Sequence, residues 1–296
     1  MSGKDLIRNH LTMSLYNHQA IWEDNEKRST RSYFCNGYLC INGKKMSKST
    51  GNFMTLKQAM NKFGSEATRI ALCDAGDTLD DANFEDETAN AAIMKLFVLE
   101  SWIQNNMPKD ALDHSADDKS TYTLWDKLLD NEINMALTKA FKAYEEMKFK
   151  NIILIFNHLV KIKESYLIAR GGERNNFVIA RLIEAILTIM NPVTPHFCQH
   201  VWQSFVYGPL SQSSNGAKVP KEMLILNGWP ASTAGDNLLC EQLKYMESVK
   251  REVRLGLDKA MSGGKKKGKG GKNAAAEPAP AKENCILAIG TEYPAF

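Results

Sequence analysis

The chain has 296 residues, 44% of them hydrophobic and 24% charged, with a formal net charge of +3. This composition is enough to bury the core of one full domain and parts of others, and the charge is too small to indicate nucleic-acid binding by itself. No apolar run approaches the roughly 20 residues that cross a bilayer, and the first residues lack a secretory signal pattern, so the cytosol is the expected compartment.

Residues 1–75 have the pattern of the end of an α/β domain. Apolar residues at helical spacing predict a helix over residues 6–22, and the charged stretch 23–31 predicts a loop. A short strand at residues 38–41 follows, and Asn42-Gly43 favours a tight hairpin because both residues tolerate positive φ. The apolar positions of the predicted helix are Leu11, Leu15, Ile21 and Trp22.

The predicted hairpin leads into Lys45-Met46-Ser47-Lys48-Ser49, which is followed by Thr50-Gly51-Asn52. The two lysines alternate with small hydroxyl residues and lead into a glycine, a pattern that suits a mobile loop closing on triphosphate oxygens. Each ammonium is a compact charge on a flexible stem, so it can follow phosphate charge as it redistributes. For a single Lys-x-x-Lys pattern the alternative is an ordinary solvated basic turn.

The loop is flanked by helix signals. Thr55 and Gln58 have the spacing of a capping box, Gly64 predicts the end of that helix, and Ser65 predicts the start of the next. A flexible segment between two ordered elements can close on a ligand and reopen, which favours a hinged functional loop.

From about residue 85 to 260 the sequence is strongly helical. Three stretches repeat apolar residues at the spacing of one helix face, and residues 89–104 add another helix. Together they predict a bundle of four or more helices with these side chains in its core. The three apolar faces are Ile133, Ala136, Leu137, Ala140, Phe141 and Tyr144; Ile152, Ile155, Phe156, Leu159, Ile162 and Tyr166; and Ile179, Leu182, Ile183, Ile186, Leu187 and Met190.

Basic residues lie off these apolar faces. Each can neutralise a phosphate, and each can equally be a solvated surface residue. A last helix over residues 239–257 carries further basic residues beside its own apolar face. The candidates for phosphate contacts are Lys139, Lys142, Lys148, Lys161 and Lys163 on the bundle, and Lys244, Lys250, Arg251 and Arg254 on the last helix.

His196 and His200, with Cys198 between them, have the spacing of metal ligands on a helix. No third ligand is apparent nearby, and Pro192 and Pro195 predict a break followed by a helix start, so we interpret the two histidines as structural. The six cysteines lack close pairs, which favours structural thiols over a zinc site.

Residues 263–270 nearly match a phosphate-binding loop, but Gly270 replaces the required Ser or Thr and no strand precedes the glycines. This stretch and the Ala- and Pro-rich residues 274–281 predict a flexible basic linker. Residues 285–289 predict a single strand after it.

The lysine loop and its surroundings resemble the class I aminoacyl-tRNA synthetases, since residues 45–49 match their signature loop. The neighbouring residues look like the archaeal and eukaryotic cytosolic leucyl-tRNA synthetases, and the run from Ala75-Gly76-Asp77-Thr78 to Asp81-Ala82-Asn83-Phe84 is associated with the leucyl branch. The likeness covers nearly the whole chain and is weaker beyond residue 192. Its other segments are residues 2–6, 9–11, 15–18, 37–39, 46–53, 192–202 and 293–294.

The resemblance implies a mainly α fold, a helical anticodon-binding bundle preceded by the tail of a Rossmann-like α/β catalytic domain. The complete enzyme would activate leucine with ATP and transfer it to tRNA(Leu), releasing AMP and pyrophosphate. We expect Lys48, with Lys45 in support, to contact the triphosphate, Ser47 and Ser49 to shape the loop and Met46 to pack it. Mg²⁺ is expected to accompany ATP, with no ligand assigned in this chain.

The resemblance also implies that the bundle binds tRNA. The contacts that we expect are Lys139, Lys142, Lys250, Arg251 and Arg254. The His-x-Gly-His element that such enzymes need does not occur among the six histidines. We therefore expect a C-terminal portion of a synthetase that is inactive alone.

The expected domains are the end of the catalytic domain at residues 1–84, the anticodon-binding domain at 85–260, the linker at 261–284 and the start of a C-terminal domain at 285–296. Two alternatives remain open. The chain can be a noncatalytic tRNA-binding module derived from a synthetase, or part of an isoleucyl- or valyl-tRNA synthetase, which share the lysine loop.

Overall fold

The computed structural model describes residues 2–22, 28–108, 117–171, 173–208 and 222–262. The chain divides into two compact units, Met1–Cys240 and Glu241–Phe296. The predicted linker from residue 263 onward, the predicted strand at 285–289 and part of the predicted loop at 23–31 lie outside the described residues. None of the described helices is both long and apolar enough to span a bilayer.

The N-terminal segment contains a pair of short parallel strands and one helix. Strand β1 (Ser2–Gly3) pairs with β2 (Cys35–Asn36), and a 3-10 turn (Lys4–Leu6) and a π-helical turn (Ile7–Leu11) lead into α1 (Thr12–Trp22). The predicted helix is therefore confirmed.

The predicted apolar face of α1 is not buried. Leu11 is buried at the start, but Leu15, Ile21 and Trp22 are exposed, Ile21 by 69%. Helical spacing predicts a helix, whereas burial of its apolar face requires another element to cover it.

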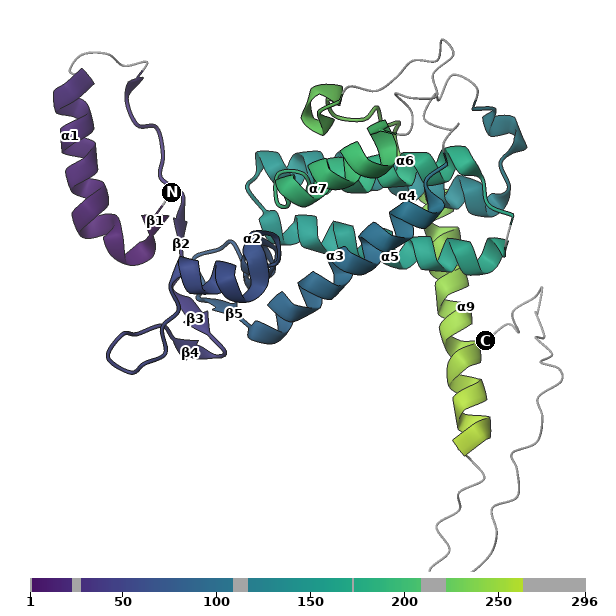
Figure 1. Cartoon of the computed structure of the whole chain (residues 1–296), viewed down its shortest axis with the longest axis horizontal. Helices are drawn as coiled ribbons and strands as arrows, with labels where there is room; N and C mark the ends of the chain where they lie inside the picture. The colour runs from purple at the N-terminus through teal and green to yellow at the C-terminus, as the bar shows by residue number, and fades with distance from the viewer. Residues whose placement is uncertain (1, 23–27, 109–116, 172, 209–221, 263–296) are drawn as a thin grey trace, which may run out of the picture. The chain divides into compact units, whose positions relative to one another are not determined.

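The lysine hairpin belongs to a three-stranded sheet with the order β4–β3–β5 (Figure 1). Central strand β3 (Leu39–Ile41) pairs antiparallel with β4 (Lys44–Lys45) and parallel with β5 (Ala82–Phe84). Asn42 and Gly43 form the turn at φ values of 50° and 77°, which confirms the predicted hairpin. The hairpin is thus held by a strand from elsewhere in the sequence.

Just before β3, the backbone at Gly37 lies close to the backbone of residues 78–80. The Gly37 amide donates to the Thr78 carbonyl oxygen at 3.1 Å, and the Tyr38 carbonyl accepts from the Ala82 amide at 2.9 Å. A Cβ atom at position 37 would lie only 2.0 Å from the Asp80 carbonyl oxygen. Only glycine fits here without a backbone shift.

Helix α2 (Leu56–Ala75) packs beside this sheet. It begins with the predicted capping box, in which the Thr55 hydroxyl accepts from the Gln58 amide and the Gln58 side chain accepts from the Thr55 amide. Gly64 has non-helical backbone angles, with φ 79° and ψ 166°, so the predicted break is confirmed as a kink that divides α2 into two helical stretches. The Phe63 ring packs against the Phe84 ring of β5 with the centroids 5.8 Å apart.

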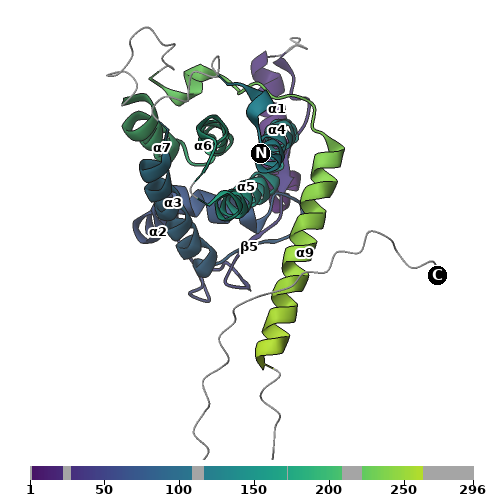
Figure 2. The same cartoon turned by 90° about the vertical axis from the view of Figure 1, so that its right-hand side faces the viewer.

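The predicted bundle is confirmed. It contains α3 (Asp86–Asn106), α4 (Leu124–Glu145), α5 (Phe149–Arg170), α6 (Asn176–Met190) and α7 (Pro195–Val201), which continues as a π-helical turn (Trp202–Tyr207). Figures 1 and 2 show α4, α5 and α6 running alongside one another. Two 3-10 turns, Lys119–Thr121 and Leu224–Asn227, lie between helices, and α9 (Asn237–Ser262) is the last described element.

The core of the bundle matches the predicted apolar faces, with Ile133, Leu137, Ile152, Leu159 and Ile183 fully buried. Three predicted core positions are exceptions. Phe141 is 50% exposed and meets the Trp229 ring edge-on at 5.8 Å instead of entering the core, and Tyr144 and Ile155 are only half-buried.

Two contacts within the first unit tie α2 and the segment after it to the bundle. The Asp77 carboxylate accepts from the Lys150 amide at 3.0 Å, in the first turn of α5, where a negative charge is favourable. The Arg69 guanidinium donates to the Val193 carbonyl oxygen at 2.6 Å and to the Pro192 carbonyl oxygen at 2.8 Å, just beyond α6. The hairpin is therefore linked to the bundle through its partner strand and through α2.

Replacing Gly37 with Ala should destabilise the first unit. The added methyl group would collide with the Asp80 carbonyl oxygen, and forced overpacking of this kind costs about 1–3 kcal/mol. Chemical or thermal unfolding of the two variants measures the loss. The control is Gly256→Ala in α9, where a Cβ meets nothing within 4 Å and the helix should gain slightly. Equal stability of the two variants would contradict the close approach.

Candidate functional site

The lysine loop, residues 45–52, closes back on its own base. The Ser47 amide donates to the Asn52 carbonyl oxygen at 2.8 Å. The Asn52 side-chain amide lies 3.0 Å from the Lys44 carbonyl oxygen and 3.2 Å from that of Lys45. Gly51 has a φ of 74°, which allows the chain to reverse. The loop is therefore a closed turn at the end of the hairpin.

Hydroxyl groups form hydrogen bonds within this turn. The Ser47 and Ser49 oxygens are 2.9 Å apart, and the Thr50 hydroxyl donates to the Ser47 carbonyl oxygen at 3.2 Å. Lys48 lies at the exposed tip, where its carbonyl accepts from the Gly51 amide. The two serines thus shape the turn that presents Lys48.

Met46 packs at the base of the loop, against the sheet and α2. It is half-buried and lines an apolar pocket of about 170 Å³ together with Leu39, Ile41 and Phe84 of the sheet and residues of α2. A flexible, unbranched side chain can remain in such a pocket while the residues after it move. This position fits the expectation that Met46 packs the loop.

The two loop lysines rest on aromatic rings. The Lys45 ammonium lies 4.2 Å from the centroid of the Tyr38 ring, and the Lys48 ammonium lies 5.3 Å from that of Phe53. Neither forms an ion pair with any carboxylate that the structure describes. Exposed cation–π contacts are worth only about 0.5–1 kcal/mol, so an anionic ligand can displace them.

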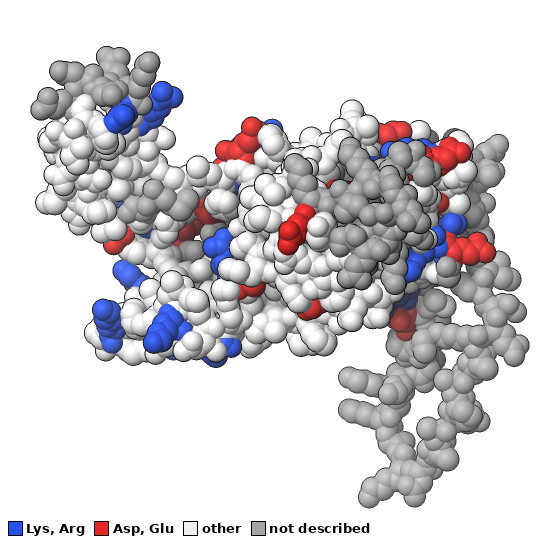
Figure 3. All heavy atoms as spheres, turned by 45° about the horizontal axis from the view of Figure 1, so that its top comes forward, with Lys and Arg blue, Asp and Glu red and all other residues white. Residues whose placement is uncertain are grey.

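Asp81, the carboxylate beside Tyr38, is neutralised by another lysine. Its oxygen accepts from Lys4 at 2.8 Å, and this hydrogen bond holds the pKa of Asp81 below, and that of Lys4 above, its ordinary value. The charge of Lys45 contributes more weakly to the same lowering, and Lys4 is the lysine that forms the ion pair with Asp81. Figure 3 shows Lys and Arg side chains gathered at the hairpin end of the first unit.

His196 and His200 do not converge. The His196 ring lies 2.9 Å from the Glu66 carboxylate of α2, whereas the His200 ring lies 3.2 Å from the Glu100 carboxylate of α3. Among the described residues, no three His, Cys, Asp or Glu side chains form a group that could hold a metal ion. The two histidines connect α7 to two different helices.

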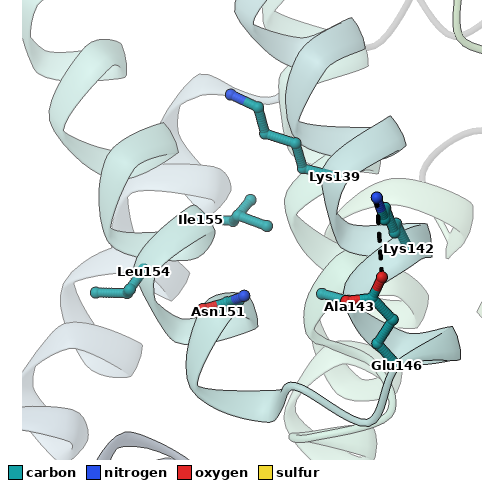
Figure 4. Close-up of a pocket in the computed structure, with 7 residues that line it drawn as sticks. All are labelled: Lys139, Lys142, Ala143, Glu146, Asn151, Leu154 and Ile155. Atoms are coloured by element: carbon teal, nitrogen blue, oxygen red, sulfur yellow. Dashed lines mark ion pairs between the residues drawn. The ribbon is translucent and has the colours of Figure 1, made fainter.

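Lys139 and Lys142 lie together at a groove of about 330 Å³ between α4 and α5 (Figure 4). The Lys142 ammonium is 3.8 Å from the Glu146 carboxylate, which also pairs with Lys148 at 2.5 Å. The hydrogen bond from Lys148 lowers the pKa of Glu146, so Glu146 stays charged and is already matched by one lysine. The groove is lined by Lys139, Lys142, Ala143 and Glu146 of α4 and by Asn151, Leu154 and Ile155 of α5.

The remaining basic candidates differ in position. Lys250, Arg251 and Arg254 are exposed on the part of α9 that belongs to the second unit. The expectation for Lys163 is wrong, because this side chain is buried with its ammonium 4.6 Å from the Trp102 ring, and burial lowers its pKa.

Sequence reasoning missed two parts of these sites. Asn52 was only a neighbour of the lysine loop, although its amide fastens the loop to the hairpin. The α5 side of the groove carries no charged residue that could have drawn attention, since it consists of Asn151, Leu154 and Ile155.

Two protein families match this chain. The family described as "Anticodon-binding domain of tRNA ligase" matches residues 126–263, and the family described as "tRNA synthetases class I (M)" matches residues 1–98. The first match contains α4 to α7 and the groove, and the second contains the lysine hairpin. Fold and loop together define a segment of a class I aminoacyl-tRNA synthetase.

The similar curated proteins are named cytoplasmic leucine–tRNA ligases. One from Pongo abelii is 32% identical over 99% of this chain, one from Saccharomyces cerevisiae is 35% identical over 94%, and one from Arabidopsis thaliana is 35% identical over 89%. The chain belongs to this leucine–tRNA ligase family. It spans only 23–24% of the length of these relatives.

A solved structure shares the fold. The LeuRS of Agrobacterium radiobacter, in a ternary complex with tRNA and LeuAMS, matches 78% of this chain and 28% of its own, with a TM-score of 0.60 and 18% identity. The mainly helical fold that the sequence predicted is therefore found in a synthetase.

Replacing Asn52 with Ala should loosen the lysine loop without unfolding the hairpin. The Lys44 and Lys45 carbonyl groups lose their shared donor, so the Ser47 amide should exchange its hydrogen roughly 5- to 10-fold faster, as expected for loss of about 1 kcal/mol. Hydrogen exchange read by NMR or mass spectrometry measures this. Asn61→Ala, at an exposed position of α2, is the matched control and should leave the rate unchanged. Unchanged exchange in Asn52→Ala would show that the amide does not fasten the loop.

Proposed function

We propose that this chain is the part of a cytoplasmic leucine–tRNA ligase that carries the phosphate-contacting loop and the tRNA-binding bundle. The proposed reaction joins leucine to tRNA(Leu) with ATP and releases AMP and pyrophosphate. The observation that carries the proposal is a pair of exposed lysines, each beside an aromatic ring: Lys45 at the end of β4 and Lys48 at the tip of the loop that follows.

The geometry suggests how the loop would act. When leucine attacks the α-phosphate, negative charge accumulates on the departing pyrophosphate, and an ammonium group that reaches those oxygens stabilises the transition state. Lys48 sits at the tip and would follow this charge, while Lys45, nearer the sheet, would support it. Ser47 and Ser49 hold the turn, and Met46 keeps its base in the apolar pocket.

ATP and leucine would be held largely by residues outside this chain, which contains no His-x-Gly-His spacing. Mg²⁺ would arrive with ATP and supply further charge neutralisation, and we assign no ligand for it here. In this proposal residues 1–84 complete the catalytic domain and residues 85–260 form the anticodon-binding domain.

The bundle would bind tRNA(Leu) through its phosphates. Lys139 and Lys142 are the contacts that we propose on the first unit, and Lys250, Arg251 and Arg254 are those on the second. The names of the relatives support leucine over isoleucine or valine as the amino acid, and the cytoplasm as the compartment.

Amino-acid-dependent exchange of pyrophosphate into ATP tests the proposed reaction. The measurement needs a version of the chain extended upstream to include a His-x-Gly-His element. Leucine should support exchange, and isoleucine and valine should support far less. No exchange with any of the three amino acids would contradict the proposal. Exchange with valine or isoleucine alone would indicate a valyl- or isoleucyl-tRNA synthetase instead.

In the same assay Lys48→Ala should lower kcat by roughly 100- to 1,000-fold, since loss of one transition-state charge contact costs about 3–4 kcal/mol. Lys57→Ala removes another exposed lysine nine residues away and should change kcat less than twofold. A Lys48 variant as active as the Lys57 variant would exclude Lys48 from the reaction.

Filter binding of tRNA(Leu) to this chain across salt concentrations tests the bundle. The logarithm of the binding constant should fall linearly with the logarithm of salt, and Lys139→Gln/Lys142→Gln should reduce the slope by about two. The control is Lys57→Gln/Lys127→Gln, at two other exposed positions of the first unit. Equal slopes for both double variants would count against Lys139 and Lys142 as phosphate contacts.

A further inference from the structure

The groove between α4 and α5 is lined by cationic, amide and aliphatic side chains. Two lysines of α4 stand on one side, and an amide and two aliphatic side chains of α5 stand on the other (Figure 4). Leu154 is 53% exposed and Ile155 is half-buried, so the α5 side offers an apolar surface to solvent. Asn151 lies one helical turn before Leu154 and Ile155 and is also exposed.

Among the residues that the structure describes, this groove is open to solvent. Its volume of about 330 Å³ is at the lower end of the range of about 300–1,000 Å³ that is common for small-molecule sites. Glu146, the one acidic residue of its lining, is matched by Lys148, so the lysines leave the rim with a positive balance. The rim therefore favours an anionic ligand with an apolar, flat part.

We propose that the α4–α5 groove holds one unstacked nucleotide of an RNA strand, with its base against Leu154 and Ile155, its polar edge toward Asn151 and its flanking phosphates at Lys139 and Lys142. The proposal rests on the proposed tRNA-binding role of the bundle and deepens it, because it adds a base contact to phosphate contacts. Every base has an apolar face, so packing against the aliphatic wall of this groove is tolerant of sequence, whereas an amide can donate to and accept from a base edge.

The short apolar wall of the groove supports an RNA strand over a helical protein partner. An acidic peptide helix would need a long apolar track, but the apolar part of the groove comes from the Leu154–Ile155 pair and the small Ala143. One flat group between two cationic side chains fits this short apolar wall better.

The test uses this full chain and a fluorescent single-stranded uridine octamer, with an abasic octamer of the same backbone as the second probe. Leu154→Glu places a carboxylate in the groove and should weaken binding of the uridine octamer roughly tenfold, the loss expected for one base contact. Ile168→Glu is the matched control, because it introduces the same charge on the same helix at a position that is 72% exposed and outside the groove.

A second variant, Asn151→Ala, should weaken binding roughly fivefold, as for one hydrogen bond. Both positions are exposed, and circular dichroism should show that the variants stay folded. Wild-type chain should prefer the uridine octamer to the abasic one, and Leu154→Glu should erase that preference.

Three outcomes would overturn the proposal. They are equal affinity of Leu154→Glu and Ile168→Glu, equal affinity of the wild type for both octamers, and an octamer affinity too weak to detect while an acidic amphipathic peptide binds. The proposed ligase reaction is read from leucine-dependent exchange, which needs no RNA. Failure of the groove and failure of the reaction are therefore distinguishable.

Discussion

The parallel pairing of β3 with β5 is the constraint on which the lysine loop depends. A two-residue hairpin alone is marginally stable in water, and β4 adds only two residues to β3. Strand β5 supports β3 from the other side, and the glycine at position 37 allows the two backbones to meet closely enough for this pairing. Asn83 accepts from the Gly43 amide at 2.7 Å, so the turn itself is also held by β5. The base of the lysine loop is therefore held on both sides of β3.

The same segment connects the loop to the helical bundle. The stretch before β5 accepts a hydrogen bond from the start of α5 through Asp77, while Arg69 of α2 binds the carbonyl groups after α6. In both contacts a charged side chain binds a backbone group near a helix end. Backbone amides at the start of a helix and carbonyl groups at its end lack partners within the helix. Within the first unit, these polar contacts add to the packing of α2 against α3 and α5 in holding the segment that carries the hairpin against the bundle.

Sequence reasoning succeeded where the decision is local. Asn42-Gly43 predicts a turn because both residues accept positive φ, and Thr55 predicts a helix start because its hydroxyl can accept from a nearby amide. Helical spacing likewise predicts the core of the bundle. The errors concern partners distant in sequence, since the Trp102 ring that covers Lys163 and the Trp229 ring that meets Phe141 cannot be read from their own helices. The groove was missed for the same reason, because two helices must pack before it exists.

We propose that the lysine loop contacts the triphosphate of ATP. An ATP analogue with an acyl group on its γ-phosphate transfers that group to the nearest lysine, and peptide mapping by mass spectrometry identifies the acceptor. On the upstream-extended version of the chain, the account predicts acylation of Lys48, and secondarily of Lys45, that excess ATP suppresses. Acylation confined to Lys44 or Lys57, or no ATP-protected lysine on residues 44–57, would contradict it.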